Sequence, residues 1–216
     1  YQSLKWQQLQ VEVYGGPLLN SWLDRDLAIA GHVVLRDGTT SLFMSTRPVA
    51  RIPQLAIHLD REVNEKGLVL NRHQHLTPVW AIGKPTTTFA EWIANQNSVS
   101  ESQIASWSAQ LVDTQNAQNF GLNNEFIASS RIDNQISCWA ALSSLISASG
   151  EQPMMVALFD HEEVGSQSST GAGGPLLEHV LERLACASGS TRTDYLAALQ
   201  KSHCVSTDNA HAVHPN

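Results

Sequence analysis

The spacing of apolar residues predicts a β-rich first part of the chain, up to about residue 127. Apolar and polar residues alternate over 8–14, which is the period of a half-buried strand. Further strands are predicted over 27–35, 41–46 and 55–59. A short helix is predicted over 86–94. The stretch 106–113 fits either a helix or a strand, and both alternatives stay open.

Beyond residue 127 the pattern changes to helices separated by short apolar runs. Helices are predicted over 136–148, 175–184 and 194–200, a buried strand over 154–159, and a further strand over 204–207. Helices and strands that alternate in this way are typical of a layered α/β domain with a parallel sheet. We therefore predict a domain boundary near residue 127.

Composition limits the class of protein and its partners. The 216 residues suffice for one domain or two small ones, and 42% of them are apolar, as in a folded protein. The apolar runs are shorter than the roughly 20 residues of a spanning helix, so no membrane partner is expected. A net charge of −7 without a basic cluster argues against nucleic acid. The cysteines, Cys138, Cys186 and Cys204, are widely spaced, which fits a reducing, cytoplasmic compartment.

A pair of adjacent carboxylates is the first candidate for chemistry. Glu162 and Glu163 follow the predicted strand 154–159 and precede a turn at Gly165. One carboxylate of such a pair can bind a metal while the other takes a proton from a metal-bound water. The alternative is a solvated surface pair, because charged residues are mostly exposed.

Two more carboxylates, Asp133 and Asp208, lie where they could join the pair. Asp133 comes at a predicted helix start, and Asp208 follows the predicted strand 204–207. Sites in open α/β sheets gather at the carboxyl ends of strands, so we expect all four carboxylates at one rim, around two zinc ions. The alternatives are a helix cap for Asp133 and an ordinary polar loop for Asp208 and His211.

The histidines offer fewer constraints than the carboxylates. His73 and His75 could bind a metal as a pair on a strand, although no acidic residue is near them in the sequence. His161, beside Glu162, could orient a ligand or simply be exposed. The tryptophans Trp22, Trp80, Trp92, Trp107 and Trp139 are interpreted as core or interface aromatics.

Several of these segments together resemble the aspartyl aminopeptidase family of binuclear-zinc exopeptidases. The similar segments are 131–134, 162–166 and 206–216, in the same order and with similar gaps, and 11–16, 22–27 and 51–59 upstream. The resemblance covers essentially the whole chain. It implies an incomplete layered α/β zinc-peptidase domain over 128–216, to which 1–11 adds a strand, and an inserted β-rich dimerisation domain over 12–127.

The resemblance also implies a role for each matching residue. Asp133 would bridge both zinc ions, Glu163 and Asp208 would each bind one, and Glu162 would be the general base. His211 would contact substrate near the metals, and His75 would reach into a neighbouring subunit's active site. Members of the family remove N-terminal acidic residues from peptides and assemble as tetrahedral homo-oligomers.

The sequence differs from the family pattern by what it lacks. The family's two zinc-binding histidines fall before Tyr1 and after Asn216, so we expect an internal fragment that is inactive alone. Two other readings remain from the residues themselves. One is a glycosidase that uses Glu162 and a second carboxylate, and the other is a metal-independent oligomerisation module.

Overall fold

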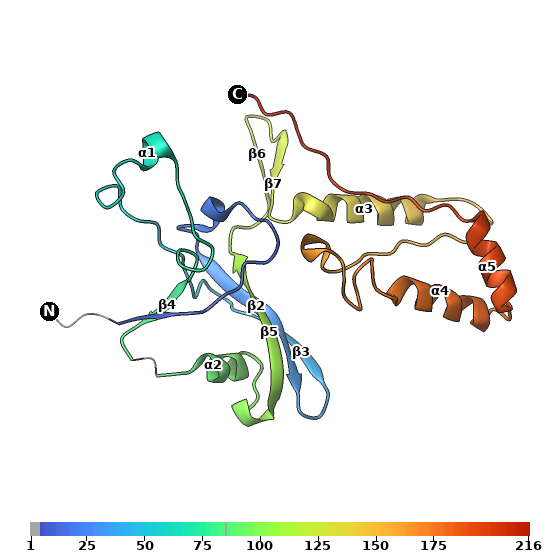
Figure 1. The fold of residues 1–216 in the computed structure, drawn as a ribbon, viewed down its shortest axis with the longest axis horizontal. Helices are drawn as coiled ribbons and strands as arrows, with labels where there is room; N and C mark the ends of the chain where they lie inside the picture. The colour runs from blue at the N-terminus through green and yellow to red at the C-terminus, as the bar shows by residue number, and fades with distance from the viewer. Residues whose placement is uncertain (1–4, 85) are drawn as a thin grey trace. The chain divides into compact units, whose positions relative to one another are not determined.

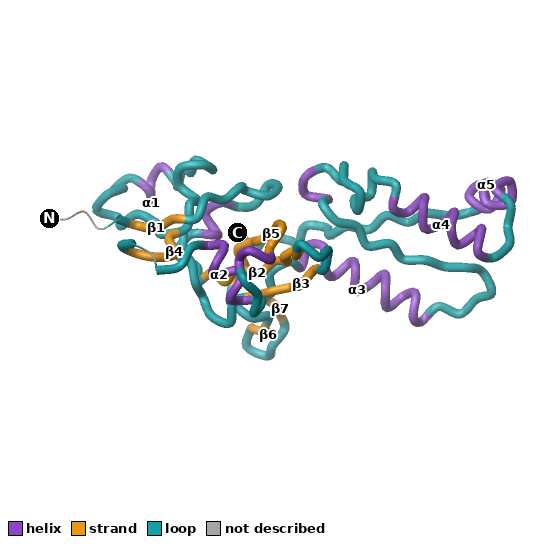
Figure 2. Tube along the Cα trace, turned by 90° about the horizontal axis from the view of Figure 1, so that it is seen from below, coloured by secondary structure: helices purple, strands orange, loops and turns teal. Residues whose placement is uncertain are grey.

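The computed structural model describes residues 5–84 and 86–216, which divide into two compact units, Tyr1–Ala128 and Ser129–Asn216 (Figure 1). Unit 1 contains the strands β1 (Trp6–Gln8), β2 (Leu27–Leu35), β3 (Thr40–Met44), β4 (Val79–Ile82), β5 (Ile104–Asp113), β6 (Gln118–Phe120) and β7 (Phe126–Ala128) and the helices α1 (Val63–Lys66) and α2 (Phe89–Gln96). Unit 2 contains α3 (Ile132–Ser147), α4 (Leu176–Ala187) and α5 (Arg192–Lys201). The strands therefore lie in unit 1 and the long helices in unit 2 (Figure 2).

Unit 1 is organised around a three-stranded antiparallel sheet of order β3-β2-β5. Its central strand, β2, has the predicted bounds, and β3 confirms the prediction for 41–46 to within two residues at each end. The ambiguous stretch 106–113 is strand, because β5 pairs with β2 along nearly its whole length. Gly31 is required in β2, since a Cβ there would lie 2.0 Å from the carbonyl oxygen of Ser108.

The core of unit 1 forms where α2 packs on this sheet. Ile29 and Val33 of β2 are buried against Ile93 and Ala94 of α2. The helix begins with a capping box between Thr88 and Glu91, which satisfies backbone donors at its first turn. The helix predicted over 86–94 is thus confirmed, although it begins three residues later than predicted. Trp80 and Trp92 pack edge to face with centroids 6.4 Å apart, as the core interpretation requires.

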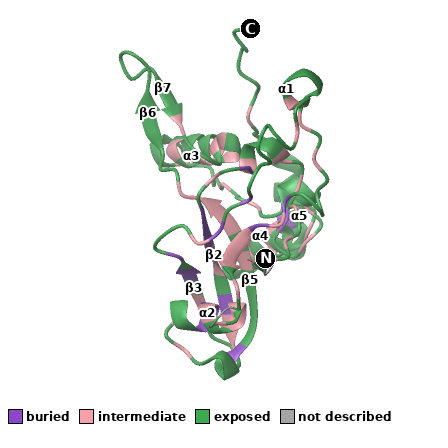
Figure 3. Cartoon of the chain, turned by 90° about the vertical axis from the view of Figure 1, so that its left-hand side faces the viewer, coloured by how far each residue is buried: buried purple, intermediate pink, exposed green. Residues whose placement is uncertain are grey.

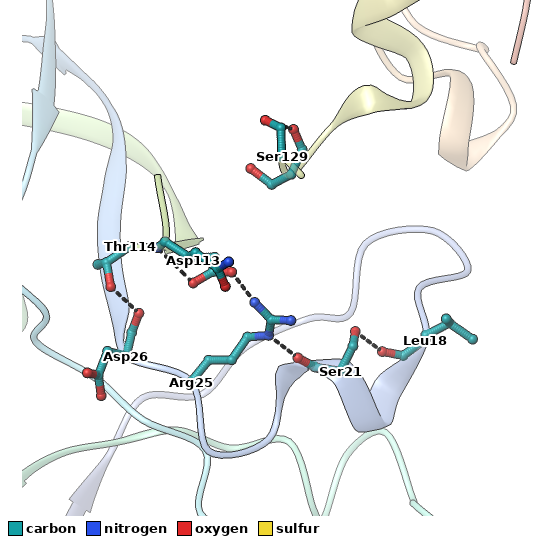
Figure 4. Close-up of polar contacts among 9 residues, drawn as sticks. Leu18, Ser21, Arg25, Asp26, Asp113, Thr114 and Ser129 are labelled. Carbon is teal, nitrogen blue, oxygen red and sulfur yellow. Dashed lines mark hydrogen bonds and ion pairs between the residues drawn. The ribbon is translucent and has the colours of Figure 1, made fainter. Parts of the chain in front are cut away.

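Residues 22–27, one of the segments that carry the family resemblance, are tied to the end of β5. Arg25 donates hydrogen bonds to the Asp113 carboxylate and to the carbonyl oxygen of Ser21, and the Thr114 hydroxyl donates to the carbonyl oxygen of Asp26 at 2.8 Å (Figure 4). Arg25 and Asp26 of this segment therefore stabilise the fold of unit 1 through these hydrogen bonds.

Two strands predicted in unit 1 are wrong. Residues 9–14 are not in a strand; β1 ends at Gln8, and β1 pairs with β4. Residues 55–59 form turns, closed by a hydrogen bond from the Leu59 amide to the carbonyl oxygen of Ala56 at 2.8 Å. Alternation gives a strand only where a neighbouring strand accepts its hydrogen bonds. Part of the segment 1–11, expected to add a strand to the peptidase domain, lies outside the described residues, which begin at Lys5.

Unit 2 confirms the predicted helices but not the predicted strands. Its helices α3, α4 and α5 lie within a few residues of 136–148, 175–184 and 194–200. Neither 154–159 nor 204–207 is a strand, because no described segment pairs with either of them. The parallel sheet expected from these strands is therefore absent from the described part of unit 2. No described helix has the length and apolar character needed to cross a bilayer.

Residues of unit 2 are mostly exposed or half-buried (Figure 3), and the exposed ones include many large apolar residues. Helices α3 and α4 bury no residue, and Tyr195 is the buried residue of α5. Trp139 of α3 is 68% exposed, so its predicted role as a core aromatic is wrong within this chain, although an interface role stays a prediction.

Candidate metal centre

Asp133 lies on an irregular stretch of backbone at the start of α3. Arg131 is left-handed (φ 62°), Asp133 and Asn134 have non-helical torsion angles, and the peptide bond between them is cis. Regular helix begins after Asn134. In the described residues, no backbone N–H donates to the Asp133 side chain, so the helix-cap alternative lacks its defining hydrogen bond. The Asp133 carboxylate is exposed and available to a ligand.

Asp208 is held near this helix start by its neighbour Asn209. The Asn209 Nδ2 donates to the carbonyl oxygen of Ile132 at 2.9 Å, and the Ser137 hydroxyl donates to Asn209 Oδ1 at 3.0 Å. Both bonds are partly buried. They bring together two segments that are more than 70 residues apart in the sequence. The first of these bonds joins Ile132, which precedes Asp133, to Asn209, which follows Asp208.

Glu162 and Glu163 lie in a short 3₁₀ helix, η3 (Glu162–Val164), within a compact loop. The loop is held by a 2.7 Å hydrogen bond between His161 Nδ1 and Ser168 Oγ, and by one of 2.8 Å from the Ser166 amide to the carbonyl oxygen of His161. The His161 ring therefore braces the loop that presents both glutamates, which are exposed. This supports neither a metal role nor a surface role by itself.

The predicted rim is not formed in the described residues, although two of its segments are linked. Among the described residues, no three His, Cys, Asp or Glu side chains lie close enough together to hold a metal ion. Hydrogen bonds link the Asp208 segment to the Asp133 segment, whereas no such bond brings Glu163 or His211 to them. The expected rim depended on parallel strands that end side by side, and those strands are not formed.

His75 belongs to unit 1 and has a defined tautomer. The Asn71 amide donates to His75 Nδ1 at 3.0 Å, so the ring proton must be on Nε2. The Asn71 side chain accepts from the amides of His73 and Gln74, which makes this segment a turn. The proposed pair of histidines on a strand is therefore wrong, and His75 offers a hydrogen-bond donor at Nε2 where a metal would need a lone pair.

Sequence reasoning missed the residues that hold the site segments in place. Asn209, Ser137 and Ser168 act through hydrogen bonds that join residues distant in sequence or across a loop. A weak signal was present for Asn209, because it follows directly after a candidate ligand. No pattern in the sequence points to Ser137.

The donor atoms fit zinc in kind, and two of the three candidate ligands are on linked segments. Asp133, Glu163 and Asp208 supply carboxylate oxygens, which zinc accepts in proteins. Asp208 Oδ1 already accepts from the Asn209 amide at 2.7 Å, which leaves its other oxygen for an ion. A buried acceptor, Asn134 Oδ1, also lacks a hydrogen-bond partner in the described part of the chain.

Comparison with known protein families identifies the family to which the chain belongs. The family described as Aminopeptidase I zinc metalloprotease (M18) matches residues 1–216. The chain belongs to the M18 family. A probable M18 family aminopeptidase 2 from Streptomyces coelicolor is 43% identical over 98% of the chain, and the match covers 50% of that protein. The chain thus spans about half the length of the curated relatives it matches.

Solved structures of M18 enzymes have the same fold over this range. The structure of Chaetomium thermophilum mApe1 is 33% identical, with a TM-score of 0.78 over 98% of this chain and 54% of that one. The S. cerevisiae mApe1 dodecamer is 28% identical, with a TM-score of 0.66 over 87% of this chain and 44% of that one. These matches confirm the aminopeptidase resemblance and the partial α/β peptidase fold. The family also argues against the glycosidase reading.

Proposed function

We propose that this M18 chain is part of a metalloaminopeptidase that releases N-terminal residues, preferably Asp or Glu, from peptides at a two-zinc site. The observation that carries the proposal is the hydrogen bond from Asn209 to Ile132, which brings the Asp208 motif to the helix start that carries Asp133. The segments that carry two candidate ligands are thereby linked in a chain whose family is described as a zinc metalloprotease.

Each carboxylate receives a role from its position and length. Asp133, with its short side chain, would be the ligand shared by both ions, while Glu163 and Asp208 would each bind one. When bound, zinc lowers the pKa of a coordinated water and polarises a carbonyl group.

Glu162 is the general base in this proposal. Its carboxylate accepts the proton of the water that attacks the first peptide carbonyl, and it returns that proton to the leaving amine. The exposed position of Glu162 next to Glu163 on η3 is compatible with one residue serving the water and the other serving the ion.

Substrate contacts come from histidines and arginines. His75 would donate from Nε2 to a substrate bound in a neighbouring subunit, and His211 would contact the substrate near Asp208. A preference for acidic N-termini requires a local cation in a protein of net charge −7. Arg72 and Arg131 are exposed and are the candidates for this contact.

The proposal also covers the assembly of the protein and its compartment. Self-association into a large homo-oligomer is supported by the dodecamer known for one M18 relative. A cytoplasmic location is supported by Cys138, Cys186 and Cys204, all of which are free thiols. Oligomers that persist unchanged after chelation and in Asp133→Ala would favour the metal-independent module instead.

The test is the substitution Glu162→Gln in a full-length protein that carries this sequence. We expect turnover of Asp- and Glu-initiated peptides to fall at least about 100-fold, the usual contribution of a general base, while zinc content is unchanged. Glu151→Gln, at another exposed glutamate, is the matched control and should keep full turnover. Retained turnover in Glu162→Gln would remove the assigned base.

A further inference from the structure

We propose that Asn209 is a positioning residue that, together with Ser137, sets the location of the Asp208 carboxylate relative to Asp133. The inference rests on the proposed function, because it assigns both aspartates to the metal site. It goes further by naming side chains that touch neither metal nor substrate and yet determine whether the two ligands can share a site.

The Asn209 side chain uses both ends of its amide. Its Nδ2 donates to the carbonyl oxygen of Ile132 at 2.9 Å, and its Oδ1 accepts from the Ser137 hydroxyl at 3.0 Å. The opposite amide orientation would place two acceptor oxygens against each other at Ile132, so these partners fix the orientation. Aspartate would lose the donor, and alanine would lose both bonds.

The anchor acts on residues adjacent to it in the sequence. Asp208 precedes Asn209, and its Oδ1 accepts from the Asn209 backbone N–H at 2.7 Å. Asp133 follows Ile132, whose carbonyl oxygen receives the Asn209 amide proton. Ser137 lies in the first regular turn of α3 and orients Asn209 from that rigid element. A short series of hydrogen bonds therefore runs from α3 through Asn209 to Asp208.

This arrangement matters because residues 204–216 have no regular secondary structure to hold them. Without the anchor, a carboxylate on such a segment would sample many positions. Zinc binding would then have to order it, and that loss of conformational entropy would weaken the affinity for zinc. Groups that orient metal ligands typically change metal affinity 10- to 100-fold when removed. We expect an effect in this range from the loss of Asn209.

The experiment measures zinc and cobalt binding by a purified full-length protein that carries this sequence. Zinc affinity is measured by competition with a chromophoric chelator, and Co²⁺ absorption reports the ligand geometry. Asn209→Ala should weaken zinc about 10-fold or more and alter the Co²⁺ spectrum. Ser137→Ala should weaken it in the same direction, Ser137→Thr should retain affinity, and the double variant Ser137→Ala/Asn209→Ala should lose little beyond Asn209→Ala alone.

Ser202→Ala is the matched control, since it removes a comparable hydroxyl bond of 2.9 Å, to the Ala198 carbonyl oxygen in α5, and should leave zinc binding unchanged. Zinc binding by Asn209→Ala equal to that of the wild type would overturn the positioning role while leaving the proposed function intact. A full-length wild-type protein that binds no zinc would overturn both. If Asn209→Ala fails to fold, the contrast between Ser137→Ala and Ser137→Thr decides, and equal affinities would overturn the inference.

Discussion

Asp133 and Asp208 combine exposed carboxylates with fixed neighbouring backbone. Each aspartate is adjacent to a partner of the same hydrogen bond, which Asn209 donates and Ile132 accepts. The ligand oxygens can therefore remain in water while their positions are restricted. In unit 1, the Asn71 backbone N–H similarly restricts His75 by donating to its Nδ1, and it leaves Nε2 free to contact a ligand.

Asp194 gives a prediction for the pH dependence of stability at this scale. Its carboxylate accepts from the Thr191 hydroxyl at 2.6 Å and from the Thr191 amide at 2.9 Å, and these bonds hold the pKa of Asp194 below its ordinary value. A lowered folded-state pKa means that this stabilisation is present above the unfolded pKa of about 3.9 and is lost as the pH falls through the folded value.

The corresponding measurement is the thermal midpoint of wild type and Asp194→Asn between pH 7 and pH 2.5. We expect the wild type to be the more stable protein near neutral pH and the difference to shrink below about pH 4, as the wild-type carboxylate takes up a proton. A difference that is constant over the whole range would show that the charge of Asp194 does not support the start of α5.

The elements that could be predicted are those specified by nearby residues. Helices α2, α3 and α4 carry their own apolar periodicity, and α2 and α5 carry their own capping boxes. The strand β2 is apolar along most of its length and ends at a turn signal, so its bounds follow from the sequence. Residues 154–159 are similarly apolar, but neither they nor 204–207 have a pairing strand among the described residues, and a strand cannot exist without one.

A glycine substitution tests the packing of the central sheet. Gly31→Ala should destabilise the chain by about 1–3 kcal/mol, because its Cβ would lie 2.0 Å from the Ser108 carbonyl oxygen and would force β2 and β5 apart. The control is Gly16→Ala, where no atom lies within 4 Å of the added Cβ and the effect should stay within about 0.5 kcal/mol. Equal denaturation midpoints for the two variants would contradict the described pairing.

For the whole molecule, the order of the motifs was more informative than any single one. Residues 131–134, 162–166 and 206–216 together led to the M18 family, whereas the Glu162–Glu163 pair alone could not be distinguished from a surface pair. The rim predicted to unite them is not formed, and the contact that joins two of them was missed. That contact, from Asn209 to Ile132, spans 77 residues, and nothing local in the sequence encodes it.

The two units also differ in how much apolar surface they bury. Unit 1 has two core clusters, while α3 and α4 of unit 2 bury no residue. The carboxylates assigned to zinc are all in the second unit, so the proposed chemistry depends on the less densely packed part of the chain.

The most direct test of the account is zinc content by elemental analysis of a full-length protein that carries this sequence, after dialysis against zinc and then against metal-free buffer. We predict that the wild type and the control Asp60→Ala retain zinc and that Asp133→Ala loses it, because Asp133 would be the ligand common to both ions. Equal zinc in Asp133→Ala and the wild type, or no zinc in the wild type, would contradict the assignment of this site.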